Sequence, residues 1–135
     1  IDLPAGEVTH KYAEGTTIEC HVHIALDGSD AGVTVVNYEL EYTIGDVGEV
    51  MSGAAIITTG DYTIPGGTAD RTHLYISFPT TIAGAGFRIG AAVKFRFRRI
   101  ALVGGGAAPS NDPFVMMVGC HIQMNTMGSR QAEVK

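Results

Sequence analysis

The sequence predicts an all-β domain, an antiparallel β-sandwich with a jelly-roll-like arrangement as its expected form. The main observation is an alternation of apolar and polar residues in segments 36–44, 93–98 and 116–125. A period of two places one side of a strand against a core and the other side in solvent. The 18 glycines indicate frequent turns. No stretch has the period of an amphipathic helix, which leaves strands as the expected elements.

The first half of the chain divides into an arm and two long strands. Residues 1–15 have little periodicity, so we expect an extended N-terminal arm, followed by a sandwich domain over residues 16–127. Residues 16–26 are expected to form a strand, and residues 27–32 have the composition of a turn. Residues 33–44 are expected to form one long strand that makes a hairpin with the first. In the first strand the expected inward side chains are Ile18, Cys20, Val22 and Ile24.

The second half alternates shorter strands with glycine-rich loops. We expect a weak strand within residues 50–59, a loop over 60–70 and a strand over 71–78, which Pro79 ends because proline cannot donate to a ladder. A strand is expected over 93–103 and a flexible loop over 104–113. The last strand is expected over 114–125, and a polar C-terminal tail over 128–135. The residues on the apolar side of the last strand are expected to be Met116, Val118, Cys120 and Ile122.

Charge and hydropathy exclude two classes of partner. The formal net charge of −5 argues against sequence-specific or general nucleic-acid binding, which needs a basic surface. The basic run 94–99 is expected to pair its alternate side chains with Glu39 and Glu41 across strands, and an anion-binding patch is the alternative. No apolar run approaches the length of a membrane span, so no membrane partner is expected.

The histidines are the sharpest local signal. His21 and His23 are two residues apart in a predicted strand, so both imidazoles project from one polar face, and His121 lies on the polar face of the last strand. Imidazole binds transition metals, which makes His21 and His23 weak candidates for a metal site. Two ligands do not close a site that needs about four. We therefore expect no metal and no cofactor, and expect these histidines at a subunit interface.

The other chemical groups predict no catalytic site. Cys20 and Cys120 are expected as buried free thiols, with a disulfide open if their strands are neighbours. Ser52 has no histidine and acid placed beside it by the sequence. A carboxylate pair for glycan hydrolysis is the remaining enzyme alternative. Its candidate residues are Asp46, Glu49, Asp61 and Asp70, which we interpret as solvated turn residues. The protein is therefore not expected to be an enzyme.

Three blocks of the sequence carry a resemblance to a known family. They are the His21-Val22-His23 strand, the segment VNYELEYTI at residues 36–44, and the ending GCHIQMNTMGSRQ at residues 119–131. Together they resemble a family of tailed-bacteriophage virion structural proteins that carry a His-x-His strand, a LEYT-like strand and a terminal HYQ…GSR segment.

The resemblance implies a virion location and a structural function. It implies a capsid decoration, head-fibre or tail-fibre assembly, and we expect a homotrimer because fibre and decoration proteins of this size commonly lie on three-fold axes. The expected partners are further copies of the chain and other virion proteins. A host-receptor or glycan-binding tip of a tail fibre is the alternative. The expected interface residues are His21, His23, His121 and Arg130.

Overall fold

A computed structural model describes residues 6–125 of the chain. Within this range the regular structure is nearly all strand, and the longest helical element is the three-residue 3₁₀ turn η1 (Gly84–Gly86). No helix in the described range is long and apolar enough to cross a membrane. The strands in chain order are β1 (Gly6–Glu7), β2 (Ile18–Ala25), β3 (Thr34–Val36), β4 (Tyr38–Gly45), β5 (Ala55–Thr58), β6 (Tyr62–Ile64), β7 (His73–Ser77), β8 (Ala92–Arg99) and β9 (Phe114–Ile122).

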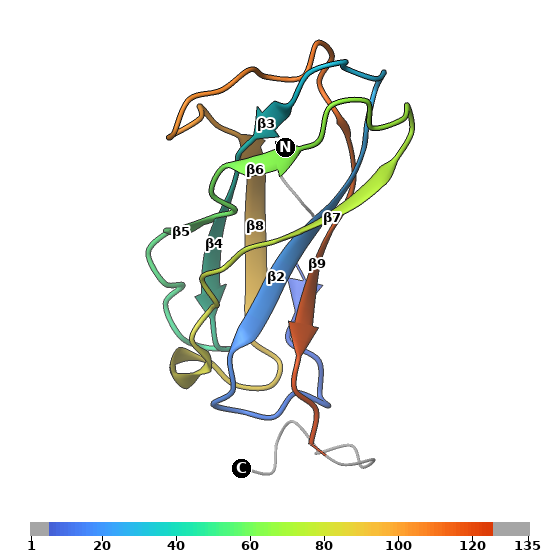
Figure 1. The fold of residues 1–135 in the computed structure, drawn as a ribbon. Coiled ribbons are helices and arrows are strands. Elements are labelled where there is room, and N and C mark those ends of the chain that lie inside the picture. The colour runs from blue at the N-terminus through green and yellow to red at the C-terminus, as the bar shows by residue number, and fades with distance from the viewer. Residues whose placement is uncertain (1–5, 126–135) are drawn as a thin grey trace.

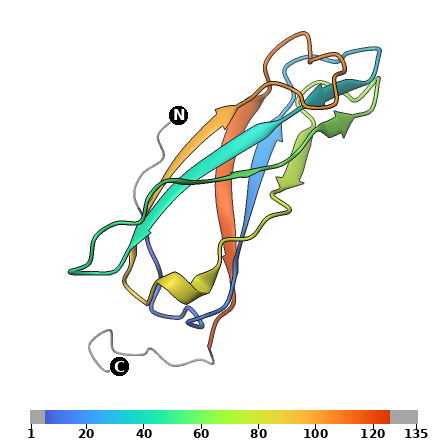
Figure 2. The same ribbon diagram turned by 90° about the vertical axis from the view of Figure 1, so that its left-hand side faces the viewer.

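The strands form two main antiparallel sheets (Figures 1 and 2). One has the order β1-β8-β4-β5 and the other has the order β7-β2-β9. A two-stranded ribbon of β3 and β6 lies at the upper end of the molecule in Figure 1. In the three-stranded sheet the first long strand of the chain, β2, lies in the centre and the last strand, β9, lies at the edge.

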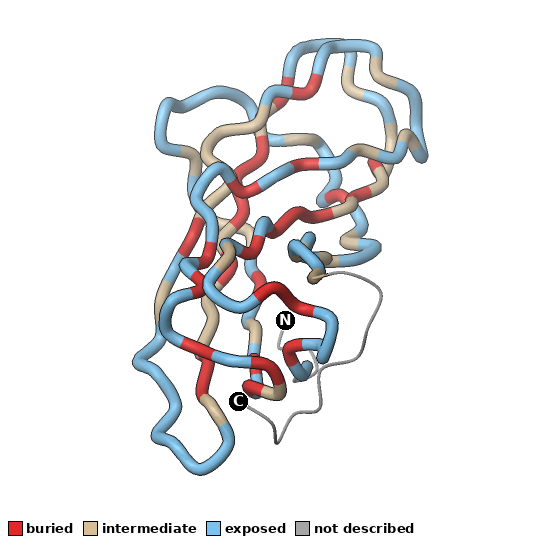
Figure 3. The backbone as a smooth tube through the Cα atoms, turned by 90° about the horizontal axis from the view of Figure 1, so that it is seen from below, coloured by how far each residue is buried: buried red, intermediate tan, exposed pale blue. Residues whose placement is uncertain are grey.

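The two sheets enclose one apolar core. Val22 and Ile24 of β2 are completely buried, as is Leu40 of β4 on the facing sheet. Tyr38 and Phe97 stack in this core with ring centroids 5.1 Å apart. Figure 3 shows buried segments in the interior of the molecule and exposed segments at the outer bends of the chain. The prediction of an all-β antiparallel sandwich is confirmed, and the jelly-roll-like arrangement stays a prediction.

The predicted charge pairing between β4 and β8 is confirmed. The register places Arg98 opposite Glu39 and Arg96 opposite Glu41 on the outer face of the sheet. The Arg98 guanidinium donates a 2.6 Å hydrogen bond from Nε to Glu39 Oε1. Arg96 and Arg98 therefore face acidic partners within their own sheet, as opposite charges on adjacent strands do, while Lys94 faces Thr43.

The single strand and hairpin expected near residues 33–44 are wrong. The segment breaks at Asn37 into β3 and β4, which belong to different sheets, and β2 pairs with β7 and β9 instead. Asn37 is 1% exposed; its side chain bonds Asp61, and its carbonyl accepts the N–H of Ile100. These bonds to two distant loops hold Asn37 out of a continuous ladder. The expected loop 60–70 also contains β6, which pairs with β3.

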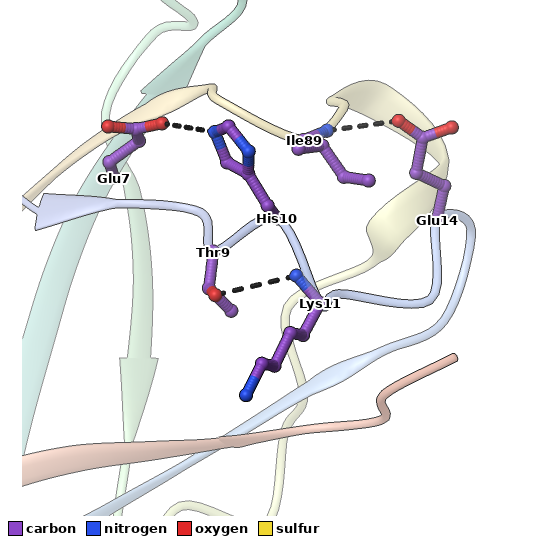
Figure 4. Close-up of polar contacts among 6 residues, drawn as sticks. All are labelled: Glu7, Thr9, His10, Lys11, Glu14 and Ile89. Carbon is purple, nitrogen blue, oxygen red and sulfur yellow. Dashed lines mark hydrogen bonds and ion pairs between the residues drawn. The ribbon is translucent and has the colours of Figure 1, made fainter. Parts of the chain in front are cut away.

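Residues 6–15, the described part of the expected N-terminal arm, lie against the sandwich. β1 pairs with β8, and Tyr12 is completely buried and stacks on Phe87 at 5.5 Å. Figure 4 shows the polar contacts of this segment, including the 3.0 Å hydrogen bond from the Ile89 N–H to Glu14 Oε1. The described part of this segment contributes to the core and does not extend away from it. The expected tail 128–135 lies outside the described residues.

Candidate functional site

The candidate site is the outer face of the β7-β2-β9 sheet, which we name the histidine face. Alternate residues of the three strands project from it, and the register brings them into rows. His23 lies between Tyr75 of β7 and Met117 of β9. The residues that define the face are His21, His23, His73, Tyr75, Phe114, Met117, Gly119 and His121. Four of the chain's five histidines thus share one surface.

His21 is the centre of the cluster. Its ring lies 4.6 Å from that of His121 and 4.8 Å from that of Tyr75, measured between centroids. The residue is only 5% exposed although it lies on the outer side of the sheet, because the neighbouring rings and Gly119 enclose it. Its Nδ1 atom is buried and has no hydrogen-bond partner among the described residues.

The surroundings of His21 favour the neutral imidazole. Burial lowers the pKa of His21 first, and the positive charges that His121 and His23 acquire on protonation lower it further. A second contact extends the cluster toward the opposite edge of the sheet, where His23 Nδ1 and His73 Nε2 lie 2.6 Å apart. One of these nitrogens must donate and the other accept, so the pair needs complementary tautomers or one shared proton.

Apolar and aromatic side chains flank the histidines. Tyr75, Phe114, Met116 and Met117 are each about half exposed or more. The Arg71 guanidinium carbon lies 5.4 Å from the centroid of the Phe114 ring, within the range of a cation–π contact. The histidine face therefore combines closely packed imidazoles with an exposed apolar margin, a composition more typical of an interface than of a solvated surface.

The expected inward position of Met116 is wrong. The register shifts between His23 and Ile24, so that His23 pairs with Met117 while Ile24 pairs with Val115. Met116 is left without a partner in the ladder and is 61% exposed. A bulge of this kind adds one residue to a strand and reverses the alternation beyond it. The shift adds apolar surface next to Met117.

The histidines contact one another through a hydrogen bond and through their rings. Within residues 6–125, no group of three or more histidine, cysteine, aspartate or glutamate side chains is placed to hold a metal ion. The 2.6 Å separation of His23 Nδ1 and His73 Nε2 is that of a direct hydrogen bond.

The structure brings together three of the four expected interface residues. His21, His23 and His121 lie in one layer, and Arg130 lies outside the described residues. His73 and Tyr75 also belong to the site, although they were not predicted there from the sequence. Both lie on the polar side of an alternating segment, which was the available signal. What the sequence did not reveal was that β7 is the neighbour of β2.

Three of the four carboxylates considered for glycan hydrolysis hold loops in place. Asp61 accepts hydrogen bonds from the backbone N–H groups of Val103 and Gly104, and Asp70 accepts one from Gly28. Asp46 accepts the N–H of Arg88. The bonds of Asp61 to two N–H groups and to Asn37 lower its pKa, because they favour the charged form. Each of these three carboxylates therefore accepts hydrogen bonds from loop backbone, which gives it a structural role.

The cysteines lie next to each other, but only one is buried. Cys20 of β2 and Cys120 of β9 are register partners, and both are free thiols. Cys20 is 2% exposed, whereas Cys120 is exposed because β9 forms the edge of its sheet. The expectation that both thiols are buried is therefore wrong for Cys120.

Comparisons with known proteins give no assignment for this site. No protein-family model, no curated protein sequence and no solved structure gives a significant match to this chain.

Proposed function

We propose that this chain is a non-enzymatic structural component of a tailed-phage virion and works as a homo-oligomer, with three copies as the expected number. It would form a capsid decoration, a head fibre or a tail fibre, in contact with other virion proteins. The observation that carries the assembly part of the proposal is the histidine face. The virion part is supported by the sequence blocks 21–23, 36–44 and 119–131, which resemble phage structural proteins.

The composition of the histidine face favours a second copy of the chain as its occupant. The chain is acidic overall, so two copies repel each other over most of their surfaces. The central rows of the face instead present imidazoles, Tyr75 and Met117, which carry no negative charge. Burial of exposed apolar side chains stabilises an interface by roughly 25 cal/mol per Å². Self-association through the central rows covers apolar surface, and the one carboxylate in the register rows of this face, Glu19 opposite His121, lies at the end of the face.

The assembly is tested by measuring mass in solution with light scattering. The wild-type chain should give a multiple of the 14.2 kDa protomer, and three is the expected multiple. Met117→Lys places a charge in the middle of the face and should shift the mass toward that of the protomer. Ile56→Lys is the matched control, because Ile56 is 54% exposed on β5 of the other sheet.

Two results would contradict this proposal. One is a monomeric wild type at micromolar concentration, and the other is equal dissociation of both lysine variants. The virion location is tested separately by peptide mass spectrometry of purified particles of the phage that encodes the chain. Absence of its peptides from those particles would reject the virion assignment while leaving the self-association result standing.

The glycan-binding tip is a second candidate, favoured by one observation. Tyr75 is 49% exposed, with the imidazoles of His21 and His23 at 4.8 and 5.4 Å. An exposed aromatic ring with polar neighbours can stack on a sugar while the neighbours bind its hydroxyls. A glycan array with wild type and Tyr75→Ala distinguishes the candidates. If the wild type binds a glycan and Tyr75→Ala does not, the glycan-binding tip is favoured. If the wild type binds no glycan, a purely structural function is favoured.

A further inference from the structure

The cysteine pair is a chemical feature that the proposed function does not use. Cys20 and Cys120 lie directly opposite each other in β2 and β9, although 100 positions separate them in the sequence. Their sulfur atoms are 2.9 Å apart, close enough for a thiol to donate a hydrogen bond to its partner. The fold therefore places the chain's only two cysteines in contact.

The backbone at this position suits a covalent link. The carbonyl of Cys20 accepts a 2.9 Å hydrogen bond from the N–H of Phe78, so the backbone polar groups of Cys20 face the β7 side. Cys20 and Cys120 therefore form a non-hydrogen-bonded pair of the antiparallel ladder, the type in which Cα atoms approach to about 4.5 Å. Disulfides form at Cα separations of about 4.4–6.8 Å. Both side chains project to one face of the sheet, so the sulfur atoms can meet with little backbone movement.

The two thiols differ in access and reactivity. Cys120 is exposed on the edge strand, whereas Cys20 lies in the core behind it. The hydrogen bond from Cys20 lowers the pKa of the Cys120 thiol, and the same contact together with burial raises the pKa of Cys20. Cys120 is therefore the thiol that an external oxidant reaches first, and its lowered pKa favours the thiolate, which is the reactive form. Cys20 is placed to act second.

We propose that Cys20 and Cys120 are an oxidisable pair that closes into an intramolecular disulfide between the centre and the edge of the β7-β2-β9 sheet. The oxidant is a small disulfide, of which glutathione disulfide is the representative. The Cys120 thiolate attacks one of its sulfur atoms, the S–S bond breaks, and one glutathione leaves as a thiolate. Cys20 then loses its proton to solvent and attacks Cys120 Sγ, which releases the second glutathione. The two electrons lost by the protein reduce the oxidant to two thiols.

This inference is independent of the proposed function, because it depends only on the β2–β9 register. Its consequence is a link that closes a loop of about 100 residues, which restricts the unfolded chain far more than the folded one. We expect the oxidised protein to melt about 10 °C higher than the reduced protein. The bond would also fix the edge strand that carries His121 to the strand that carries His21.

The experiment incubates the folded full-length protein with excess glutathione disulfide and then counts thiols and measures intact mass. The expected product is a monomeric chain with no titratable thiol and a mass about 2 Da below that of the reduced chain, reversed by dithiothreitol. In the reduced protein, brief treatment with iodoacetamide should alkylate Cys120 and spare Cys20. Cys20→Ser should stop at a stable mixed disulfide on Cys120.

Cys120→Ser is the second variant, because its site is exposed and the substitution leaves the core intact. It should keep the fold, resist the oxidant and lose the redox dependence of Tm. Three outcomes would overturn the proposal. They are two thiols that persist in the folded wild type, a mixed disulfide that Cys20 never resolves, and a bond that joins two chains instead of two strands.

Discussion

The ring of His21 lies against the backbone of Gly119, its register partner on β9. A Cβ atom added at Gly119 would lie 2.5 Å from His21 Nε2 and 2.8 Å from Cε1. Real Cβ atoms do not make contacts this short, so the absence of a side chain at residue 119 allows His21 to pack beneath His121. The histidine cluster therefore depends on a glycine as much as on its imidazoles.

Gly119→Ala should displace the His21 ring and destabilise the protein by about 1–3 kcal/mol, the usual cost of overpacking a tightly enclosed site. Urea unfolding gives the change in stability, and imidazole NMR resonances report the displacement of His21. Gly53→Ala is the control, because a Cβ at Gly53 meets no atom within 4 Å. Equal stability of Gly119→Ala and wild type, with unchanged His21 resonances, would show that the ring does not lie where the structure places it.

Stability should fall as the pH drops below about 6.5, the pKa of an unperturbed histidine. The folded-state pKa of His21 is lowered, so between the two pKa values the unfolded chain binds more protons than the folded chain. The stability associated with neutral His21 is complete above about 6.5 and is lost as the pH falls through the folded pKa. Urea midpoints measured between pH 8 and pH 5 check this direction.

His21→Phe keeps an aromatic ring at this site and removes the titrating group, so it should reduce the loss of stability on acidification. His10→Gln is the control, because His10 is an exposed residue whose ring bonds Glu7 away from the histidine face. It should retain the wild-type pH dependence. If His21→Phe and wild type lose stability in parallel, the titrating group lies elsewhere.

Gly84→Ala should destabilise the protein severely, by about 2 kcal/mol or more, because the new methyl group would overlap backbone. A Cβ at buried Gly84 would overlap both the carbonyl oxygen of Thr16 and the hydroxyl of Tyr12, which donates a hydrogen bond to that carbonyl. Gly86→Ala, in the same 3₁₀ turn, meets no atom within 4 Å and should be nearly neutral. Thermal unfolding of both variants tests the contrast, and similar melting temperatures would refute it.

Asp61→Asn should loosen the loop that begins at Val103. The carboxylate accepts the N–H groups of Val103 at 3.0 Å and Gly104 at 2.5 Å, and an amide oxygen is a weaker acceptor for both. Amide hydrogen exchange at these two residues should accelerate while exchange in β2 stays unchanged. Because the folded pKa of Asp61 is lowered, its stabilisation is present above about pH 4 and is lost as the pH falls through the folded value.

The control for this loop is Asp27→Asn, since the Asp27 carboxylate accepts no hydrogen bond from a loop N–H among the described residues. Exchange at Val103 and Gly104 should be the same in this variant as in wild type. Unchanged exchange in Asp61→Asn as well would mean that the loop is held by other contacts.

Alternation in the sequence predicted which side chains face the core but not which strands are neighbours. In β2 the inward set Ile18, Cys20, Val22 and Ile24 was correct, because a period of two is a local property of the backbone. The pairing of β2 with β9 depends on contacts between distant segments, and no short-range signal in the sequence encodes it. The predicted site therefore contained the histidines of β2 and β9. It lacked His73 and Tyr75, because β7 was not recognised as a neighbour of β2.

Two further misses have local causes that alternation does not reveal. Val36 and Tyr38 fit one period, yet Asn37 between them divides the strand because its buried amide bonds Asp61. Met116 also fits the period of β9, and a bulge reverses its side. A polar residue inside an apolar segment and five consecutive apolar residues at 114–118 were the available warnings.

The separation of β2 from β9 along the chain also determines when the protein can fold. β2 leaves the ribosome well before its edge partner β9, which begins about 90 residues further along the chain at Phe114. During the interval the inward side chains of β2 have only part of their final cover. Pairing of such distant segments makes folding slow, and the β7-β2-β9 sheet is completed only after β9 has been synthesised. Truncated nascent chains that end before β9 would expose Val22 and Ile24 to chaperones and to one another.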